Sequence, residues 1–292
     1  SFAAKSMGKR GLKLKKTTCF FLICLSFIFV FPVWFLTVSS FMGENELTDL
    51  LLPVLKEGSK EYASWKLLPQ YPTLKHYVEI LLDSPEFFVM FWNSVKLTAG
   101  ALTGTLLVGM PAAWGLAKFD FPGKNILFTL YIALMMMPFQ VMLLGNYLVL
   151  DKFGLLDSLS GIILPAAFST FPVFIMYRFF KGIPTALLEA ARLDGAGELR
   201  LFFMIAIPLG SPGVISAIVL GFLEYWNLIE QPMAFLKTKK LWPLSLYLPS
   251  IGLEQAGSAF AASMVTLAPA ILVFLAGQDY LEQGIVSTAV KE

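Results

Sequence analysis

The sequence carries little charge. Aspartate, glutamate, lysine and arginine make up 14% of its 292 residues, whereas hydrophobic residues make up 57%, and the mean hydropathy is +0.72. Soluble domains usually contain about 25% charged and about 45–50% apolar residues. The composition therefore excludes a disordered chain and argues strongly against a soluble enzyme. The net charge of +2 is too small to indicate a nucleic-acid partner.

Cysteine and histidine are also scarce. Cys19 and Cys24 lie five residues apart in one apolar run, where a helix places them about 140° apart around its axis, so they cannot pair with each other. With His76 as the one histidine, the sequence predicts no metal site. Clustered catalytic side chains, which a membrane-embedded enzyme needs, are missing as well. We interpret the cysteines as apolar filler and His76 as a surface residue.

A phosphate-binding loop is missing too. The sequence contains no G-x-x-x-x-G-K-[ST] pattern, and its nearest approach, Gly123-Lys124-Asn125, lacks both the preceding glycine spacing and the hydroxyl residue. The chain is therefore not expected to hold ATP through such a loop, and no catalytic residue or cofactor is predicted for it.

Long apolar runs are abundant. A helix that crosses a bilayer needs about 20 mainly apolar residues, and six runs qualify: 18–42, 87–117, 126–150, 161–180, 207–229 and 258–280. Strict alternation of apolar and polar residues is not seen in them, which excludes a transmembrane barrel. The sequence predicts an all-α membrane protein with six transmembrane helices.

Lysine and arginine predict the orientation. The basic N-terminus, 1–17, contains no acidic residue and is expected in the cytoplasm, so that six spans place both termini there. Residues 1–6, before Met7, are treated as an expression remnant. The loop with Lys237, Lys239 and Lys240 should then lie outside, although basic loops are expected in the cytoplasm. We keep this orientation because the N-terminus and the other loops agree with it.

This orientation divides the chain into segments. The first transmembrane helix, 18–42, is followed by a polar extracytoplasmic segment, 43–85, which is long enough for a small cap with one or two short helices. A core domain, 86–280, contains the other five spans and a cytoplasmic loop at 181–206. A cytoplasmic tail, 281–292, ends the chain.

The loop at 181–206 has the pattern of two short helices. Pro184 suits a first helical turn, the residues after it are good helix formers, and Asp194-Gly195 ends the helix because glycine tolerates a positive φ. A second helix can start at Glu198. Small apolar residues near Ala190 suit insertion into a groove of another protein, although an interfacial connector without a partner fits the same pattern.

The amino-acid sequence of this loop resembles a motif of a known protein family. The string E-A-A-R-L-D-G-A-G at 189–197, followed by I-P-L at 207–209 and by Pro212, resembles the EAA loop of permeases from bacterial binding-protein-dependent ABC importers. The likeness is greatest to the carbohydrate branch, which includes the smaller permease of the maltose transporter. Further similar stretches lie at 72–77, 91–94, 112–119, 137–140, 154–158, 226–227 and 284–291, and 43–71 is not covered well.

The resemblance implies a type I ABC-importer permease fold and a helix that couples the membrane domain to a cytoplasmic ATPase. Glu189 would face the ATPase, Ala190 and Ala191 would allow close approach, Asp194 would cap or brace the turn, and Gly195 would make it. The residues that the resemblance assigns to coupling are Glu189, Ala190, Ala191, Asp194, Gly195 and Ala196.

Candidates for the translocation pathway lie within the spans. An acidic side chain in an apolar span is costly unless it faces a wet or paired interior, while aromatic and amide side chains suit sugars. These criteria select Asn93, Gln140, Asn146, Glu224, Tyr225, Trp226 and Asn227. For the α-helical group at 224–227, an interfacial belt near the outer boundary is the alternative. The residue after Trp226-Asn227 is Leu228, where the family often has an acid.

The function expected from the resemblance is import of a sugar or oligosaccharide across the bacterial cytoplasmic membrane. The implied partners are a second homologous permease, two ATP-binding cassette subunits that bind ATP and Mg²⁺, and an extracytoplasmic solute-binding protein. The alternatives are an ABC importer for a non-carbohydrate solute and a self-contained ion-coupled transporter. The latter is disfavoured because charges within the spans are few and no inverted repeat is evident.

Overall fold

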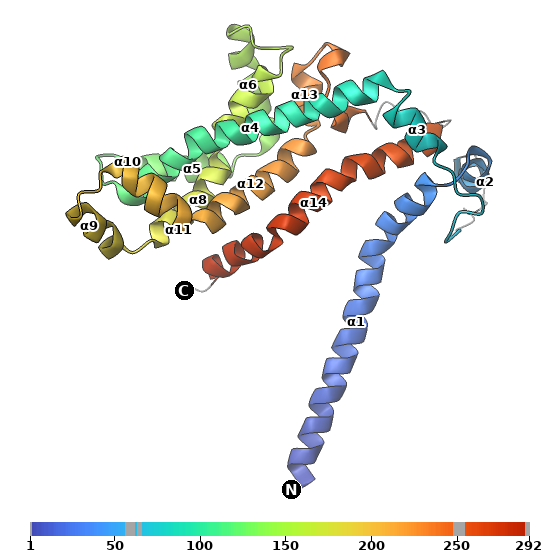
Figure 1. Ribbon diagram of the computed structural model, residues 1–292, viewed down its shortest axis with the longest axis horizontal. Helices are drawn as coiled ribbons and strands as arrows, with labels where there is room; N and C mark the ends of the chain where they lie inside the picture. The colour runs from blue at the N-terminus through green and yellow to red at the C-terminus, as the bar shows by residue number, and fades with distance from the viewer. Residues whose placement is uncertain (1, 56–61, 63–65, 248–254, 290–292) are drawn as a thin grey trace. The chain divides into compact units, whose positions relative to one another are not determined.

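The computed structural model describes residues 2–55, 62, 66–247 and 255–289, and every regular element in these ranges is helical (Figure 1). The chain forms two compact units. One consists of Ser1–Asp83 with Ile251–Val265, and the other of Ser84–Ser250 with Thr266–Glu292.

The first unit begins with the long helix α1 (Phe2–Ser40). From Thr18 to Val30 its described side chains are exposed, which suits a helix surrounded by lipid. Its end is packed, because Val38, Met42 and Leu47 form a buried cluster with Phe260 of α14 (Ala256–Ala289). The hydroxyl groups of Ser40 and Tyr77 lie 2.8 Å apart.

The polar segment after α1 contains α2 (Glu44–Leu55) and α3 (Lys75–Leu81). Glu46 is 8% exposed. Its carboxylate accepts a hydrogen bond from the backbone N–H of Gln70 at 3.0 Å and lies 3.6 Å from the Lys66 ammonium. Lys75 pairs with Glu44 at 2.8 Å. These contacts attach the coil before α3 to α2.

The prediction that His76 lies on the surface is wrong. Its side chain is 3% exposed and packs so tightly against Gly257 that a Cβ there would collide with the imidazole. Positions 76 and 80 share one side of α3, and Ile80 is 1% exposed, so this side of the helix is the buried one. His76 Nδ1 lies 3.4 Å from Glu79 Oε2.

The second unit contains most of the helices. In chain order they are α4 (Pro85–Lys118), α5 (Lys124–Met135), α6 (Phe139–Lys152), α7 (Ser160–Ala167), α8 (Thr170–Gly182), α9 (Thr185–Leu193), α10 (Glu198–Leu201), the π-helix η1 (Phe202–Ala206), α11 (Ile207–Leu209), α12 (Ser211–Trp226), α13 (Glu230–Phe235), the 3₁₀ turns η2 (Lys239–Leu241) and η3 (Leu244–Leu246), and the rest of α14.

Four segments of the described chain are long and apolar enough to cross a membrane: Thr18–Ser40, Pro85–Lys118, Ser160–Gly182 and Ala256–Glu282. Two bent pairs raise the number to six if each is one span. They are Lys124–Met135 with Phe139–Lys152, bent by 106°, and Glu198–Leu209 with Ser211–Trp226, bent by 71°. The structure therefore supports four to six spans, and the predicted runs at 126–150 and 207–229 coincide with the bent pairs.

Small residues let the helices of the second unit approach closely. α4 contacts α7, α8 and α12. A Cβ at Gly104 would lie 2.6 Å from the Ala167 Cβ of α7, and one at Gly213 would overlap the Phe179 ring of α8. Lipid tails are as apolar as leucine, so close packing rather than water exclusion stabilises such contacts.

The α4–α7 contact predicts an asymmetry between two glycine-to-alanine changes. Gly104→Ala should lower the melting temperature in detergent, because overpacking a close contact costs about 1–3 kcal/mol. Gly145→Ala is the matched control, since Gly145 lies within α6 with no atom near a Cβ, and alanine gains about 0.5–1 kcal/mol over glycine in a helix. Equal melting temperatures for the two variants would contradict the packing described.

Candidate functional site

The EAA loop, residues 181–206, begins where α8 ends. Ile183 is extended, Pro184 precedes α9, and Gly195 has φ +82°, after which α10 starts at Glu198. The predicted short helix, glycine turn and second helix are confirmed. Asp194 N and Ala196 N donate to the carbonyls of Ala190 and Ala191, which closes the end of α9.

One side of the EAA loop is buried and the other is exposed. Leu188 and Leu201 are 2% and 0% exposed, and both belong to the core cluster of the second unit. Glu189 and Ala190 are exposed, while Ala191 is half-buried. Asp194 and Gly195 are exposed too, and Ala196 is half-buried. The tip of the loop is therefore available for a contact with another molecule.

Large apolar side chains also lie on the open side of this loop. Leu193 is 90% exposed, Leu199 is 76% exposed and Leu187 is 49% exposed. Exposed apolar side chains grouped on one loop are typical of an interaction surface. Together with the small residues of α9 they fit the helix-in-groove mode of recognition.

An ion pair spans the turn of the loop. Arg192 Nε donates to Glu198 Oε1 at 2.9 Å, and this bond is the main cause that raises the pKa of Arg192. Asp194 was expected to cap or brace the turn. It is the C-cap residue of α9, but its exposed carboxylate forms no hydrogen bond or ion pair in the described part of the chain. The sequence signal that was missed is the pair of opposite charges on either side of Gly195. An exposed pair of this kind contributes little to stability, because water screens the two charges.

The stems of the loop are held by aromatic packing. Trp114, near the end of α4, makes edge contacts with Phe180 of α8 at 5.8 Å and a tilted contact with Phe202 of η1 at 6.2 Å, measured between ring centroids. Trp114 and Phe202 are 5% and 7% exposed, and Phe180 is fully buried. The loop is thus fixed at both ends and free at its tip.

The predicted pathway residues of α12 divide into two pairs. Glu224 and Asn227 are exposed, and Asn227 Nδ2 donates to the Leu223 carbonyl at 2.8 Å. Tyr225 and Trp226 are 5% and 3% exposed, and both use their polar atoms inside the unit. Tyr225 OH donates to the Ala166 carbonyl at 3.3 Å, and Trp226 Nε1 donates to the Thr266 carbonyl at 2.9 Å.

The remaining pathway candidates lie apart from one another. Asn93 is 5% exposed, and its amide donates to the carbonyls of Lys240 and Trp242 at 2.7 and 3.2 Å. Gln140, in the first turn of α6, is exposed, and Asn146 of the same helix is half-buried. Neither side chain forms a hydrogen bond within the described residues. The structure thus leaves Glu224, Asn227, Gln140 and Asn146 accessible, and it uses Asn93 to hold a loop.

That loop, residues 236–246, lies at the opposite end of α12 from the EAA loop and is pinned along its length. Asp157 accepts hydrogen bonds from Lys237 N at 2.9 Å, Thr238 N at 2.8 Å and Thr238 Oγ1 at 2.6 Å. Ser94 Oγ accepts one from Leu244 N at 2.7 Å. The loop therefore presents three exposed lysine side chains, Lys237, Lys239 and Lys240, on a fixed backbone.

The environment of Asp157 favours its ionised form. The hydrogen bonds from Thr238 are the main cause that lowers the pKa of this carboxyl. A lowered folded-state pKa means that the stabilisation is present above the pKa of the unfolded chain and is lost as the pH falls through the folded-state value. At neutral pH the three hydrogen bonds that Asp157 accepts from Lys237 and Thr238, here called the Asp157 clamp, are therefore intact.

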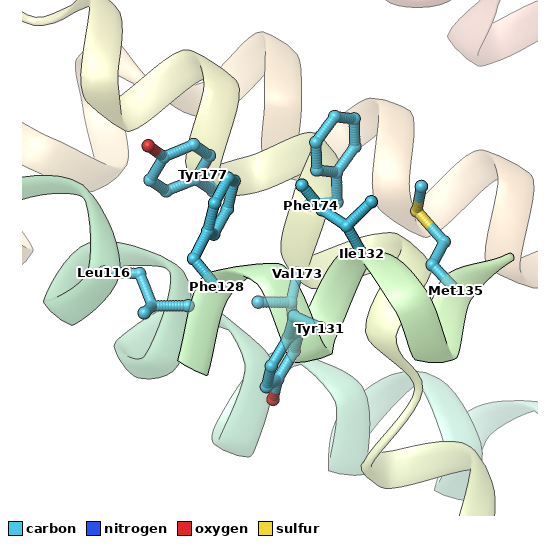
Figure 2. A pocket seen from close by; sticks show the side chains of 8 residues that line it. All are labelled: Leu116, Phe128, Tyr131, Ile132, Met135, Val173, Phe174 and Tyr177. Atoms are coloured by element: carbon cyan, nitrogen blue, oxygen red, sulfur yellow. The ribbon is translucent and has the colours of Figure 1, made fainter. Parts of the chain in front are cut away.

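A narrow crevice between α4, α5 and α8 is not a site for a polar ligand. Figure 2 shows the apolar and aromatic side chains that line it, which are Leu116, Phe128, Tyr131, Ile132, Met135, Val173, Phe174 and Tyr177. Hydrogen-bonding groups that a sugar needs do not converge there. Clusters of histidine, cysteine and acidic residues with the spacing of a metal site are also not found among the described residues.

Comparison with known protein families identifies the family to which this chain belongs. Residues 105–287 match the model described as "Binding-protein-dependent transport system inner membrane component". The matched region spans the EAA loop, α12 and most of the second unit. The chain belongs to this family. The resemblance carried by the EAA letters is thereby confirmed, and with four to six apolar helices the chain is a multi-pass membrane protein.

Individual permeases of this kind are similar over nearly the whole chain. The arabinooligosaccharides transport system permease protein AraQ of Bacillus subtilis is 31% identical, with 94% of each chain covered. The diacetylchitobiose uptake system permease protein NgcG of Streptomyces coelicolor is 30% identical over 87% of this chain and 81% of its own. The sn-glycerol-3-phosphate transport system permease protein UgpE of Yersinia enterocolitica is 31% identical over 70% and 75%.

A solved structure shares the permease fold. It is described as a bacterial ABC transporter involved in the import of the acidic polysaccharide alginate, and the superposition has a TM-score of 0.79 with 91% of this chain and 96% of that chain covered. The sequence identity is 20%, so this likeness establishes the fold alone.

The turn of the EAA loop predicts that valine is not tolerated at Gly195 of the permease but is tolerated at Gly197. Gly195→Val should abolish solute uptake while membrane insertion stays intact, because a β-branched residue is strained at φ +82°. Gly197→Val is the control, since Gly197 has φ −75° and open space around a Cβ. Normal uptake by the Gly195→Val permease would show that transport does not depend on this turn.

The Asp157 clamp predicts a change in protease sensitivity. Asp157→Ala removes three acceptor contacts, so trypsin should cleave the permease after Lys237, Lys239 or Lys240 several times faster at pH 7.5. Asp151→Ala, at an exposed acid near the end of α6, should leave cleavage unchanged. The rates are read from gel-resolved fragments in detergent, and equal rates for the two variants would show that Asp157 does not order the loop.

Proposed function

We propose that this chain is the permease subunit of an ATP-driven importer for a sugar or oligosaccharide. It would have six spans with both termini in the cytoplasm of a bacterium, and would form half of a translocation pathway with a second, homologous permease. The observation that carries the proposal is the EAA loop: a helix with a free, partly apolar tip and fixed stems, within a chain of the binding-protein-dependent family.

The loop is proposed to dock into a cleft of a cytoplasmic ATPase subunit. Leu193 and Leu199 supply exposed apolar surface, Ala190 permits close approach, and Glu189 supplies a charge at the rim. A charge at such a rim mainly affects the rate and specificity of association. Because the sequence contains no P-loop, two partner ATPase subunits would bind ATP and Mg²⁺. Their closure would move the coupling loops and reorient the spans.

A carbohydrate is the favoured substrate class. The printed names of two relatives, AraQ and NgcG, refer to arabino-oligosaccharides and to diacetylchitobiose. Delivery by an extracytoplasmic binding protein is supported by the family description and by a structural neighbour with a TM-score of 0.55, described as an alginate ABC transporter in complex with a periplasmic protein. Glu224 and Asn227 are the pathway residues best placed to meet hydroxyl groups, because both are exposed on an apolar helix.

A non-carbohydrate solute is the second candidate. The relative UgpE is named for sn-glycerol-3-phosphate, so a small phosphorylated solute belongs in any substrate test. An ion-coupled transporter is less well supported, since family membership points to transport with a binding protein.

The deciding experiment reconstitutes the permease in lipid with the partners encoded by neighbouring genes and measures ATP hydrolysis. The binding protein is added with neutral oligosaccharides, acidic oligosaccharides or glycerol 3-phosphate. Stimulation by one oligosaccharide class is the expected result, and the same complex carrying Gly195→Val should not be stimulated. Stimulation by glycerol 3-phosphate alone would refute the carbohydrate assignment, and failure of any complex to form would refute the coupling role of the EAA loop.

A further inference from the structure

The last residue of α4 contacts the start of the EAA loop. The Lys118 ammonium donates to the Ile183 carbonyl at 2.6 Å and lies 3.4 Å from the Lys181 carbonyl. Ile183 joins the end of α8 to Pro184, directly before the exposed helix α9. We propose that Lys118 is a positioning residue that fixes where α9 begins, and thereby ties the coupling loop to α4. This inference rests on the proposed function for its role in transport, but the contact can be tested independently.

The end of α8 needs such a partner. The last carbonyl groups of a helix receive no hydrogen bond from an N–H of the same helix. Pro184 cannot supply one, because it has no N–H. The Ile183 N–H bonds to the Phe180 carbonyl at 3.2 Å, and the carbonyls of Lys181 and Ile183 point to Lys118. An ammonium has three donors, and a positive charge is favoured at the negative end of a helix dipole.

The surroundings make the contact more than a surface interaction. Ile183 is 6% exposed and Lys118 is half-buried, so the bond to the Ile183 carbonyl is partly shielded from water. One turn earlier on α4, Trp114 packs on Phe180 before the loop and on Phe202 after it. The final turn of α4 therefore holds both stems, one by aromatic packing alone and the other by packing and hydrogen bonds.

This arrangement assigns separate tasks to the two contacts. Aromatic packing is not directional enough to set the exit angle of the chain at Pro184, whereas a 2.6 Å bond to the preceding carbonyl restrains the peptide directly. Without it, the hydrogen bonds of α9 would open more often, and the helix would lose a fixed orientation relative to α4. A movement of α9 would then be transmitted poorly to the span to which α4 belongs.

The first test measures hydrogen exchange of the full chain in lipid nanodiscs without partners. Lys118→Met keeps the length of the side chain and removes its donors, while Lys118→Arg retains donors. We expect the amides of residues 185–193 to exchange about tenfold faster in Lys118→Met, the ratio that corresponds to about 1.4 kcal/mol, and near the wild-type rate in Lys118→Arg. Unchanged exchange in Lys118→Met would overturn the inference.

The control is Lys124→Met. Lys124 is also a lysine at a helix end of the second unit, but it pairs with the exposed Asp120 at 3.1 Å and makes no hydrogen bond to the EAA loop among the described residues. The exchange rates of residues 185–193 in Lys124→Met should equal those of the wild type. If Lys118→Met fails to insert, Lys118→Gln, which keeps a shorter amide donor, provides an intermediate variant.

The second test measures uptake per ATP hydrolysed in the reconstituted complex. Lys118→Met should assemble with its partners to the wild-type extent yet transport several times less substrate per ATP, and Lys118→Arg should restore the ratio. A purely structural role would reduce assembly and leave the ratio unchanged. If the wild-type complex shows no ATP-driven uptake, the proposed function fails, while the exchange result still judges the contact. A wild-type ratio in Lys118→Met would overturn the positioning role.

Discussion

The second unit depends on how closely other helices can approach α4. Gly100 and Gly104 face Ile163 and Ala167 of α7, where a Cβ would lie 2.7 and 2.6 Å from side-chain atoms. In lipid no large hydrophobic driving force holds helices together, so the association of α4 with α7 depends on this close packing. The small residues therefore determine which side of α4 meets α7 and α8, and so where the stems of the EAA loop emerge.

Close packing in lipid leaves little water for buried polar groups, so these groups must find partners within the protein. The carbonyl of Ala166, near the break between α7 and α8, accepts hydrogen bonds from Thr105 of α4 and Tyr225 of α12. Ser216 Oγ lies 2.9 Å from the Tyr280 carbonyl and joins α12 to α14. Polar side chains within the spans thus hold helix breaks and helix pairs, which explains why a polar residue in an apolar run is not by itself evidence of a pathway.

This distinction marks the limit of what the sequence can predict. Hydrophobic run length located the four long apolar helices and the two bent pairs, and the Asp194-Gly195 pair located the turn of the EAA loop, because both signals are local. Local patterns did not reveal that Tyr225 and Trp226 bond to carbonyls of other helices, or that Asn93 bonds to a loop almost 150 residues away. They also placed His76 wrongly, because its burial depends on contact with Gly257. Tertiary partners decide these roles, and a single sequence does not specify them.

The bends show the same limit at the level of whole elements. The run at 126–150 contains Met137-Pro138, and proline removes a backbone donor, so an interruption was foreseeable from the residues. At Gly210 a local signal, Pro208 and Pro212, is joined by a tertiary one: a Cβ there would lie 2.5 Å from the Phe180 ring and 2.9 Å from the Ala206 carbonyl. Hence the 71° bend before α12 and the burial of Phe180 are parts of one packing solution.

The two loops at the ends of α12 solve different physical problems. Residues 236–246 are pinned by Asp157, Asn93 and Ser94 along the backbone, so little of that loop is left to order when a partner binds. The EAA loop is restrained at its stems and exposed at Leu193 and Leu199. On the proposed function, a loop that transmits force needs this second design: its stems must be stiff for a displacement to reach the spans, and its tip must stay uncovered to meet the ATPase.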